Sequence, residues 1–338
     1  MADRAALAGR FLVASGWAGA TRRTIAGDAS ARRYERVTLG QRRAILMDSP
    51  PGAADDPADF VKISGHLRGI GLNAPEIHDA DLSAGFLLLE DFGDDTFARV
   101  LARSPDLETR LYALACDVLV RLQAAGRPDG LADLSADHWA DAAMVALDWY
   151  RFAVTGDRGD TASLQHVLSD ALRRYADGPR VMILRDYHAE NLMWLPDRQG
   201  LHRAGLLDFQ LGQLGQPGYD LVSLLQDARR DVAPSTEADI IARFCAATGA
   251  DNVAFGESYA VLGIQRALRI LGVFARLCLA GGKPGYLGLV PRVWAQLRRN
   301  LDALALAPLS ELCDSLLPEP TTANLETIAR KCAQIPPP

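Results

Sequence analysis

The sequence predicts an α+β protein with a small amino-terminal lobe built on an antiparallel sheet and a larger, mainly helical carboxyl-terminal lobe. Three observations predict this class. Short apolar runs bounded by turn residues occur between residues 22 and 90. From about residue 94 onward, apolar residues recur with the 3.6-residue period of amphipathic helices. That period is interrupted once, between residues 180 and 209, by short apolar runs that carry polar residues at their ends.

The composition is that of a folded protein with a large core. The chain has 338 residues, of which 49% are hydrophobic, and this excludes disordered, collagen-like and disulfide-scaffold proteins. Its 36 basic residues are outnumbered by 42 acidic ones, which argues against a general nucleic-acid binder, because clustered Lys and Arg supply most of the affinity for phosphate backbones. The five cysteines are odd in number and far apart in the sequence, so we expect free thiols in a reducing compartment.

No targeting or membrane segment is evident. Charged residues interrupt the apolar pattern of residues 1–16, unlike the core of a signal peptide, and there is no run of 18 apolar residues. We therefore expect a cytoplasmic monomer that has neither a membrane nor a nucleic acid as its partner.

The small lobe is expected to span residues 1–91. Turn residues at 26–30 and 39–41 separate three short strands. The last apolar run of the lobe is continuous and ends abruptly in acidic residues, as in a buried strand that leaves its sheet. The expected elements are a helix at 2–16, three strands between 22 and 48, a helix at 57–68, and strands at 76–82 and 85–90.

The large lobe is expected to span residues 92–338. The short strands between residues 180 and 209 would form a rigid platform inside a helical lobe, which is the usual setting of a functional site. The expected helices lie near residues 95–103, 107–125, 138–153, 161–176, 218–228, 236–248, 253–281, 288–305 and 322–333.

Three side chains in the interrupted segment indicate phosphoryl transfer. Asp186 is followed five positions later by Asn191, and an apolar strand pair then ends in Asp208. This order matches the catalytic and metal-binding loops of protein kinases. One carboxylate orients the attacking hydroxyl and accepts its proton, while an amide oxygen and a second carboxylate hold Mg²⁺ against the nucleotide phosphates. Each residue alone could cap a helix or stabilise a turn, but the combination favours catalysis.

The chain also resembles a known family at several places. The segments 186–191, 208–210 and 219–225 resemble the aminoglycoside-phosphotransferase-like small-molecule kinases. The closer likeness is to the bacterial anomeric sugar kinases that phosphorylate N-acetylmuramate and N-acetylglucosamine at C1 during cell-wall recycling. The likeness covers about residues 5–300 and includes the motifs at 27–34, 85–91, 265–266 and 272–277.

The resemblance implies a bilobal, protein-kinase-like fold with ATP and Mg²⁺ as cofactors and a small amino sugar as acceptor. It implies that Asp186 is the catalytic base and that Asn191 and Asp208 are the Mg²⁺ ligands. It places a phosphate-covering loop at Gly27, Asp28, Ala29 and Ser30, where small residues let backbone N–H groups approach oxyanions. It also implies an adenine-binding hinge formed by the backbone around Leu89, Glu90, Asp91 and Phe92.

Two positions depart from the family pattern. Met47 stands where a phosphate-binding lysine is expected, and Leu184 stands where many such kinases have histidine. A guanidinium from Arg32 or Arg33 could replace the lysine, Lys62 could do so, or the site could bind nucleotide poorly and be inactive. Because the base, both metal ligands and the loop length are kept, we favour an active enzyme.

The acceptor site is less clear from the sequence. Arg266 and Arg269 lie on the polar side of the helix near 253–281, where they could simply face solvent or form salt bridges. Alternatively, one of them binds an acidic acceptor such as the lactyl carboxylate of N-acetylmuramate. Asp220 either contributes to this substrate site or holds the catalytic loop by hydrogen bonds. Other possible functions are a kinase for an aminoglycoside, choline or a homoserine-like alcohol, and a catalytically weak nucleotide-binding accessory protein.

Overall fold

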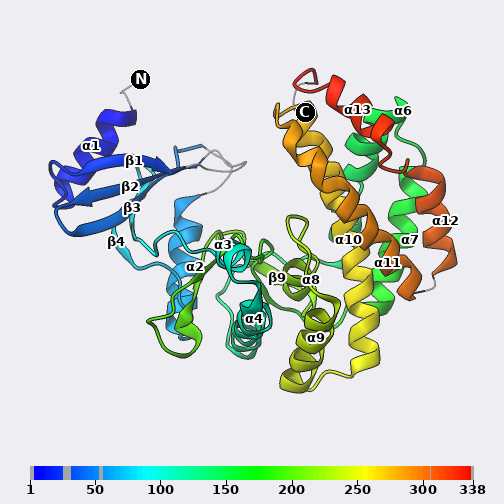
Figure 1. The fold of residues 1–338 in the computed structure, drawn as a ribbon, viewed down its shortest axis with the longest axis horizontal. Coiled ribbons are helices and arrows are strands. Elements are labelled where there is room, and N and C mark those ends of the chain that lie inside the picture. Colours follow the sequence, from blue (N-terminus) through cyan, green and yellow to red (C-terminus); the bar gives the residue numbers. More distant parts are fainter. Residues whose placement is uncertain (1–3, 26–31, 53–55, 305, 336–338) are drawn as a thin grey trace. The chain divides into compact units, whose positions relative to one another are not determined.

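The computed structural model describes residues 4–25, 32–52, 56–304 and 306–335, which form two compact units (Figure 1). Unit 1 comprises Met1–Gly130 with Ala189–Gly212, and unit 2 comprises Leu131–His188 with Gln213–Pro338. These boundaries differ from those of the lobes expected at residues 1–91 and 92–338. That the first lobe binds the nucleotide and the second binds the substrate stays a prediction.

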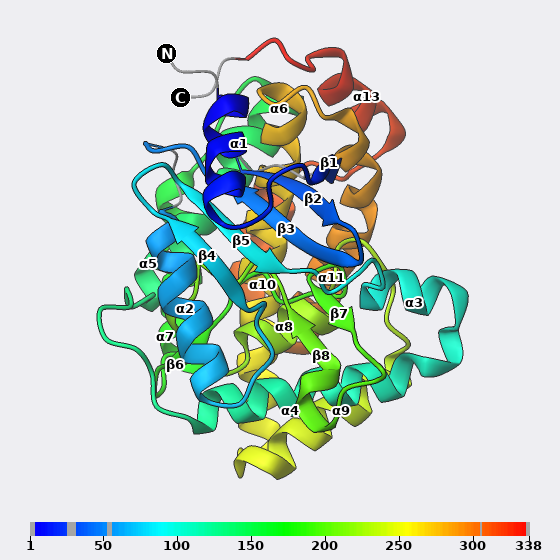
Figure 2. The same cartoon turned by 90° about the vertical axis from the view of Figure 1, so that its left-hand side faces the viewer.

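Unit 1 contains the antiparallel sheet that the sequence predicts. The strand order is β1-β2-β3-β5-β4, and all neighbouring strands are antiparallel. Helix α1 (Arg4–Ala14) covers one face of this sheet (Figure 2). The structure therefore confirms the expected helix and the expected strands, with slightly different bounds. The strands are β1 (Thr21–Ile25), β2 (Arg33–Leu39), β3 (Arg42–Asp48), β4 (Ile77–Asp81) and β5 (Phe86–Glu90).

The two faces of the sheet have different environments because successive side chains of a strand point to opposite sides. Phe11 of α1 stacks on Phe86 of β5, with ring centroids 5.7 Å apart. Val37 and Leu46 join the same core cluster. Met47 and Arg36 have the opposite parity, so they belong to the face turned away from α1.

The rest of unit 1 consists of helices and a β-hairpin. Helix α2 begins at an N-cap, where the Asp56 carboxylate accepts a 2.8 Å hydrogen bond from the Ala58 N–H and Pro57 occupies the first turn. The bounds are α2 (Pro57–Gly69), α3 (Phe97–Arg103), α4 (Glu108–Ala124), β7 (Leu192–Trp194) and β8 (Ala204–Leu206), with 3₁₀ turns at Pro105–Leu107 and Gly200–Arg203.

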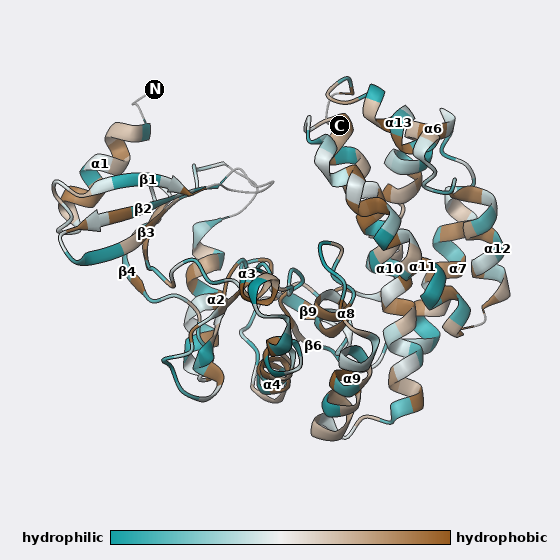
Figure 3. Ribbon diagram, viewed as in Figure 1, coloured by the Kyte–Doolittle hydropathy of each residue, from teal (hydrophilic) through white to brown (hydrophobic). Residues whose placement is uncertain are grey.

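Unit 2 is mainly helical, and its longest helix, α10, packs against α11, α7, α5 and α8. Polar and apolar residues alternate along α9 and α11, as expected for helices that bury one face (Figure 3). The elements are α5 (Ala136–Ala143), a π-helix (Ala146–Arg151), α6 (Phe152–Thr155), α7 (Thr161–Tyr175), β6 (Val181–Ile183), β9 (Gln213–Gly215), α8 (Tyr219–Leu225), α9 (Pro234–Thr248), α10 (Asn252–Leu279), a 3₁₀ helix (Pro284–Leu289), α11 (Val290–Leu304), α12 (Ala307–Leu316) and α13 (Thr322–Arg330).

The structure differs from the sequence prediction in three elements of unit 2. The single helix expected at 138–153 is divided into α5, the π-helix and α6. Close backbone packing coincides with this irregular turn, because an added Cβ at Gly272 of α10 would come within 2.2 Å of the Val145 carbonyl. Strand β9 and helix α12 were not predicted.

Two expectations about the whole chain can be compared with the structure. The five cysteines are free, as expected, and four of them are buried. Within the described residues, no helix is both long enough and apolar enough to cross a membrane.

Candidate active site

The segment that carries Asp186 begins where strand β6 ends, in unit 2. Arg185 has a positive φ of 72°, which is uncommon for a residue with a side chain. The Asp186 N–H donates a 2.9 Å hydrogen bond to the Leu184 carbonyl. A tight, unusual turn therefore presents the half-buried Asp186, the residue predicted to be the catalytic base.

Asp220, at the start of α8, holds this turn by its backbone. Its carboxylate accepts hydrogen bonds from the Leu184 N–H at 2.6 Å and from the Arg185 N–H at 2.9 Å. The carboxylate is completely buried, and burial raises its pKa to about 6, against the lowering effect of the two N–H groups and of Arg266. Of the two roles considered for Asp220, these contacts match the support of the catalytic loop.

Arg266 of α10 contacts the same turn. Its Nη1 lies 3.3 Å from the Arg185 carbonyl oxygen, and its Nη2 donates a 2.7 Å hydrogen bond to the Ser223 hydroxyl. The guanidinium also lies over the Tyr219 ring, 4.9 Å from the centroid. Arg266 is thus packed among residues of the loop and of α8.

Arg269, one helical turn further along α10, has different surroundings. It is half-buried, and its side chain forms no hydrogen bond or ion pair with the residues that the structure describes. Burial lowers the pKa of the neighbouring Arg185, and the positive charges of Arg269 and Arg266 lower it further. Three arginines, Arg185, Arg266 and Arg269, therefore lie at or near the turn that carries Asp186.

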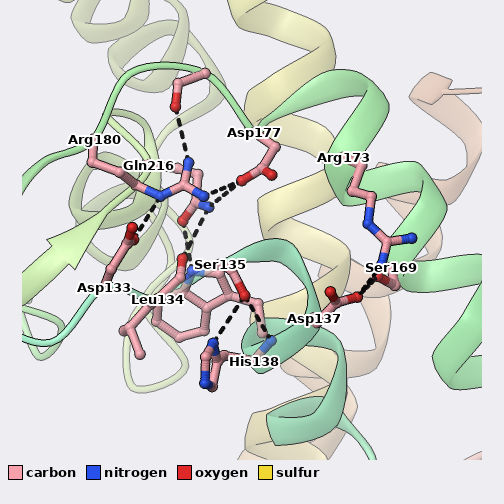
Figure 4. A network of polar contacts seen from close by, with 12 residues as sticks. Asp133, Leu134, Ser135, Asp137, His138, Ser169, Arg173, Asp177, Arg180 and Gln216 are labelled. Atoms are coloured by element: carbon pink, nitrogen blue, oxygen red, sulfur yellow. Dashed lines mark hydrogen bonds and ion pairs between the residues drawn. The ribbon is translucent and has the colours of Figure 1, made fainter.

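A polar network, buried at Trp139 and Gln216 and exposed at its acidic residues, holds the chain just before α8 (Figure 4). The indole N–H of Trp139 donates a 2.6 Å hydrogen bond to the Gln216 amide oxygen, and the Gln216 Nε2 lies 3.2 Å from the Leu134 carbonyl. Arg180 joins this network through ion pairs with Asp133 and Asp177. The network anchors the chain four residues before Asp220.

Asn191 and Asp208, the predicted metal ligands, belong to unit 1 and flank the β7–β8 hairpin. Leu192 pairs with Leu206, and the Leu207 N–H donates a 3.0 Å hydrogen bond to the Asn191 carbonyl. The antiparallel register therefore brings both residues to the same end of the hairpin.

The conformation around Asp208 is well defined. Asp208 has a positive φ of 55°, and its Oδ1 accepts a 2.8 Å hydrogen bond from the Gln210 amide. The next residue, Phe209, is buried and packs on Phe60 of α2, with ring centroids 4.7 Å apart. Packing of Phe209 in the core thus leaves the Asp208 side chain exposed.

The chemistry of this pair fits Mg²⁺. Magnesium prefers hard oxygen ligands and is usually held by one or two protein carboxylates together with phosphate oxygens and water. Asp208 offers a carboxylate and Asn191 an amide oxygen at one hairpin end. Among the residues with described positions, there is no group of three or more His, Cys, Asp or Glu side chains that could form an all-protein metal cage.

The side chains of the predicted hinge are used for packing and ion pairs. Glu90 pairs with Arg198, whose guanidinium also lies 5.0 Å from the centroid of the Phe92 ring. Phe92 packs against Gly205 of β8, where an added Cβ would come within 2.7 Å of the ring. Leu89 is buried. The side chains of this segment thus have partners within the fold, and adenine binding by its backbone groups stays a prediction.

Asp91 has an ionic partner that the sequence analysis did not identify. Arg36 of β2 lies 2.7 Å from its carboxylate through Nε, and a further ion pair joins Arg36 to Asp94 at 3.0 Å. The sequence could have indicated this pair, because a basic residue on the buried side of a strand needs an acidic partner.

The candidates for replacing the missing lysine have distinct surroundings. Met47 is fully buried. Arg32 is buried, with Nη1 3.4 Å from the Tyr34 hydroxyl, while Arg33 is exposed. Lys62 donates a 2.5 Å hydrogen bond to the Asp129 carbonyl. The expected phosphate-covering loop, Gly27, Asp28, Ala29 and Ser30, lies outside the described residues.

Comparison with known proteins decides the family. The model of the phosphotransferase enzyme family (APH) matches residues 21–255. The chain belongs to this family. It is 36% identical to an N-acetylmuramate/N-acetylglucosamine kinase of Caulobacter vibrioides, over 94% of this chain and 98% of that one. It is 35% identical to a protein of the same name from Pseudomonas aeruginosa, over 86% of each chain.

Solved structures of APH-like kinases share the fold, which confirms the predicted protein-kinase-like class. A choline/ethanolamine kinase family protein from Mesorhizobium loti is 13% identical and has a TM-score of 0.59, covering 96% of this chain and 99% of its own. A choline kinase from Cryptosporidium parvum is 12% identical, with a TM-score of 0.57 and coverage of 93% and 97%.

Proposed function

We propose that the protein is an ATP-dependent kinase that phosphorylates the anomeric hydroxyl of N-acetylmuramate, N-acetylglucosamine or both, giving the 1-phosphate for peptidoglycan recycling. The observation that carries the proposal is that four relatives, 30–36% identical over 86–94% of this chain, are named N-acetylmuramate/N-acetylglucosamine kinases. The enzyme is proposed to act on a small-molecule sugar as a cytoplasmic monomer, without a membrane or nucleic-acid partner.

In this reaction Asp186 accepts the proton of the anomeric hydroxyl and orients its oxygen toward the γ-phosphorus. Asn191 and Asp208 would hold Mg²⁺ through their side-chain oxygen atoms. When bound, the ion neutralises charge on the phosphates of ATP. The chain contributes mainly position and electrostatics, because phosphoryl transfer demands little covalent participation from the protein.

For the nucleotide, we propose that backbone groups from Leu89 to Phe92 bind adenine and that the segment 27–30 covers the phosphates. Of the residues that could replace the lysine at Met47, we favour Arg32. Its guanidinium lies near Tyr34, which pairs with Met47 across the β2–β3 ladder. Arg33 has the opposite strand parity, and Lys62 already donates to the Asp129 carbonyl.

For the acceptor, we propose that Arg269 binds the lactyl carboxylate of N-acetylmuramate. A half-buried arginine without a partner among the described side chains is suited to an anion, and a guanidinium binds a carboxylate with two parallel hydrogen bonds. An aminoglycoside site would instead require a surplus of carboxylates to meet a polycation, whereas three arginines lie at or near the turn that carries Asp186.

Incubation with Mg·ATP and each amino sugar tests the function. We expect sugar-dependent release of ADP, with phosphorus NMR showing the new phosphate on the anomeric oxygen. Activity on choline, homoserine or an aminoglycoside in place of the amino sugars would assign a different acceptor. Thermal stabilisation by Mg·ATP with no ADP release for any alcohol would indicate a nucleotide-binding accessory protein.

A further inference from the structure

We propose that Arg266 is a positioning residue of this kinase, which holds the backbone of the catalytic turn and does not bind the sugar. This inference rests on the proposed function. It assigns different roles to two arginines that are one turn apart on α10: Arg266 acts on the enzyme itself, whereas Arg269 acts on the acceptor.

Several hydrogen bonds converge on the backbone carbonyl group of Arg185. The Arg185 carbonyl oxygen lies 3.3 Å from Arg266 Nη1 and accepts a second hydrogen bond, also of 3.3 Å, from the Ser223 hydroxyl. Arg266 Nη2 in turn donates a 2.7 Å hydrogen bond to that hydroxyl oxygen. Arg266 therefore fixes the Arg185 carbonyl both directly and through Ser223.

These hydrogen bonds hold an uncommon backbone conformation. A positive φ at a residue with a side chain is disfavoured and persists only where the surroundings over-determine it. Arg185 has such a φ, and its N–H is bound by Asp220 while its C=O is bound by Arg266 and Ser223. Both backbone groups of the residue before Asp186 are thus held from α8 and α10, and the direction of the Asp186 side chain depends on them.

The Arg266 guanidinium has little freedom to reach a substrate. It lies over the Tyr219 ring, which stacks on Trp139 with centroids 4.2 Å apart. The adjacent Gln265 is fully buried and donates a 2.9 Å hydrogen bond to the Trp139 carbonyl. Helix α10 is therefore fixed against Trp139 at the position from which Arg266 extends.

The charge of Arg266 also acts on the Asp220 carboxylate. The buried Asp220 carboxylate has two charged neighbours from other elements, Arg266 on α10 and Asp186 on the catalytic turn, with opposite effects on its pKa. Arg266 lowers this pKa and Asp186 raises it. Without the guanidinium, Asp220 would take up a proton at higher pH and would then be a poorer acceptor for the N–H groups of the turn.

The test compares Arg266→Met and Arg266→Lys with Arg276→Met, an exposed arginine on the same helix as a matched control. For R266M we expect kcat to fall at least tenfold with N-acetylmuramate and N-acetylglucosamine alike, with little change in either sugar's KM. We also expect the acidic limb of the kcat profile to move to higher pH. R266K keeps the charge and should restore the position of that limb but only part of the rate, while R276M should match the wild type.

Three results would overturn the inference: a loss confined to N-acetylmuramate, a rise in sugar KM at unchanged kcat, or an R266M enzyme indistinguishable from R276M. R266K answers the same questions if R266M does not fold. A wild-type chain without sugar-dependent ADP release would instead refute the proposed function. In that case, amide hydrogen exchange of residues 181–187 still measures the positioning role. Exchange should be faster in R266M than in the wild type and R276M. Equal exchange in the three proteins would refute the positioning role.

Discussion

Arg36 of β2 and Asp91, which follows β5, form a buried bidentate ion pair, with Nε–Oδ2 and Nη2–Oδ1 distances of 2.7 and 2.9 Å. The side chains are 8% and 4% exposed. The same guanidinium donates a 3.0 Å hydrogen bond to the Gly93 carbonyl. One arginine therefore fixes the segment that leaves the sheet at the predicted adenine-binding hinge.

Removal of one partner of this pair should be strongly destabilising. Breaking a buried ion pair leaves an uncompensated charge and costs about 3–5 kcal/mol. We expect Arg36→Met to lower the free energy of unfolding by about 3 kcal/mol and to raise KM for ATP, because the hinge loses its support. Urea unfolding and ATP-dependent kinetics measure both effects. Arg43→Met, which removes an exposed arginine from β3, is the control, and equal effects of the two variants would contradict the assignment.

Asp186→Asn should abolish most turnover without preventing nucleotide binding. General-base catalysis typically contributes a factor of about 10²–10⁴, and the asparagine cannot accept the proton. We expect kcat to fall by at least a hundredfold, with the Kd for Mg·ATP from calorimetry nearly unchanged. A parallel loss of ATP affinity would show that Asp186 acts on the nucleotide.

Asp220 should set the acidic limb of the activity profile. Its pKa is raised to about 6 by burial, so the carboxylate gains a proton as the pH falls through 6 and accepts the Leu184 and Arg185 N–H groups less well. We expect kcat to decline below about pH 6. A kcat profile that stays flat down to pH 5 would contradict this role.

The same carboxylate should affect folding stability with the opposite sign. Because its pKa in the folded state lies above the ordinary value of 3.8, the folded state binds this proton more readily than the unfolded state does. Its contribution to stability is therefore complete below about pH 4 and is lost as the pH rises through 6, a change of roughly 3 kcal/mol at about 1.4 kcal/mol for each pKa unit. The difference in unfolding free energy between wild type and Asp220→Asn, followed from pH 4 to 7, measures this change.

Arg269→Met should alter the choice between the two sugars. The lactyl carboxylate is present in N-acetylmuramate and absent from N-acetylglucosamine, so loss of a charge-assisted hydrogen bond of about 1.5–3 kcal/mol should affect the first sugar selectively. We expect kcat/KM for N-acetylmuramate to fall by about tenfold to a hundredfold relative to that for N-acetylglucosamine. Equal losses on both sugars would reject the carboxylate role.

Arg32→Met should raise KM for ATP by about tenfold or more, because a phosphate contact from a guanidinium would be lost. Arg33→Met, at the adjacent exposed position, is the comparison, and we expect a much smaller change. If Arg33→Met has the larger effect, the exposed arginine is the one that binds phosphate.

Much of this protein was predictable from local sequence. The strands between residues 21 and 48 and the helices α2, α4, α7 and α10 follow from apolar periodicity and turn residues, which act over a few positions. The order and spacing of Asp186, Asn191 and Asp208 indicate a kinase for the same reason, because the motif lies within a short segment. The family comparison confirmed both the fold class and the kinase assignment.

Tertiary structure alone decided which distant residues meet. Arg36 and Asp91 are 55 positions apart, and Arg185 and Arg266 are 81 apart, so no periodicity links them. The irregular turn between α5 and α6 likewise lies where Gly272 of α10 packs closely on the backbone of Val145. Helix and strand formation depend on neighbours in the chain, whereas the pairing of buried charges and the support of a catalytic turn depend on which elements the folded core brings together.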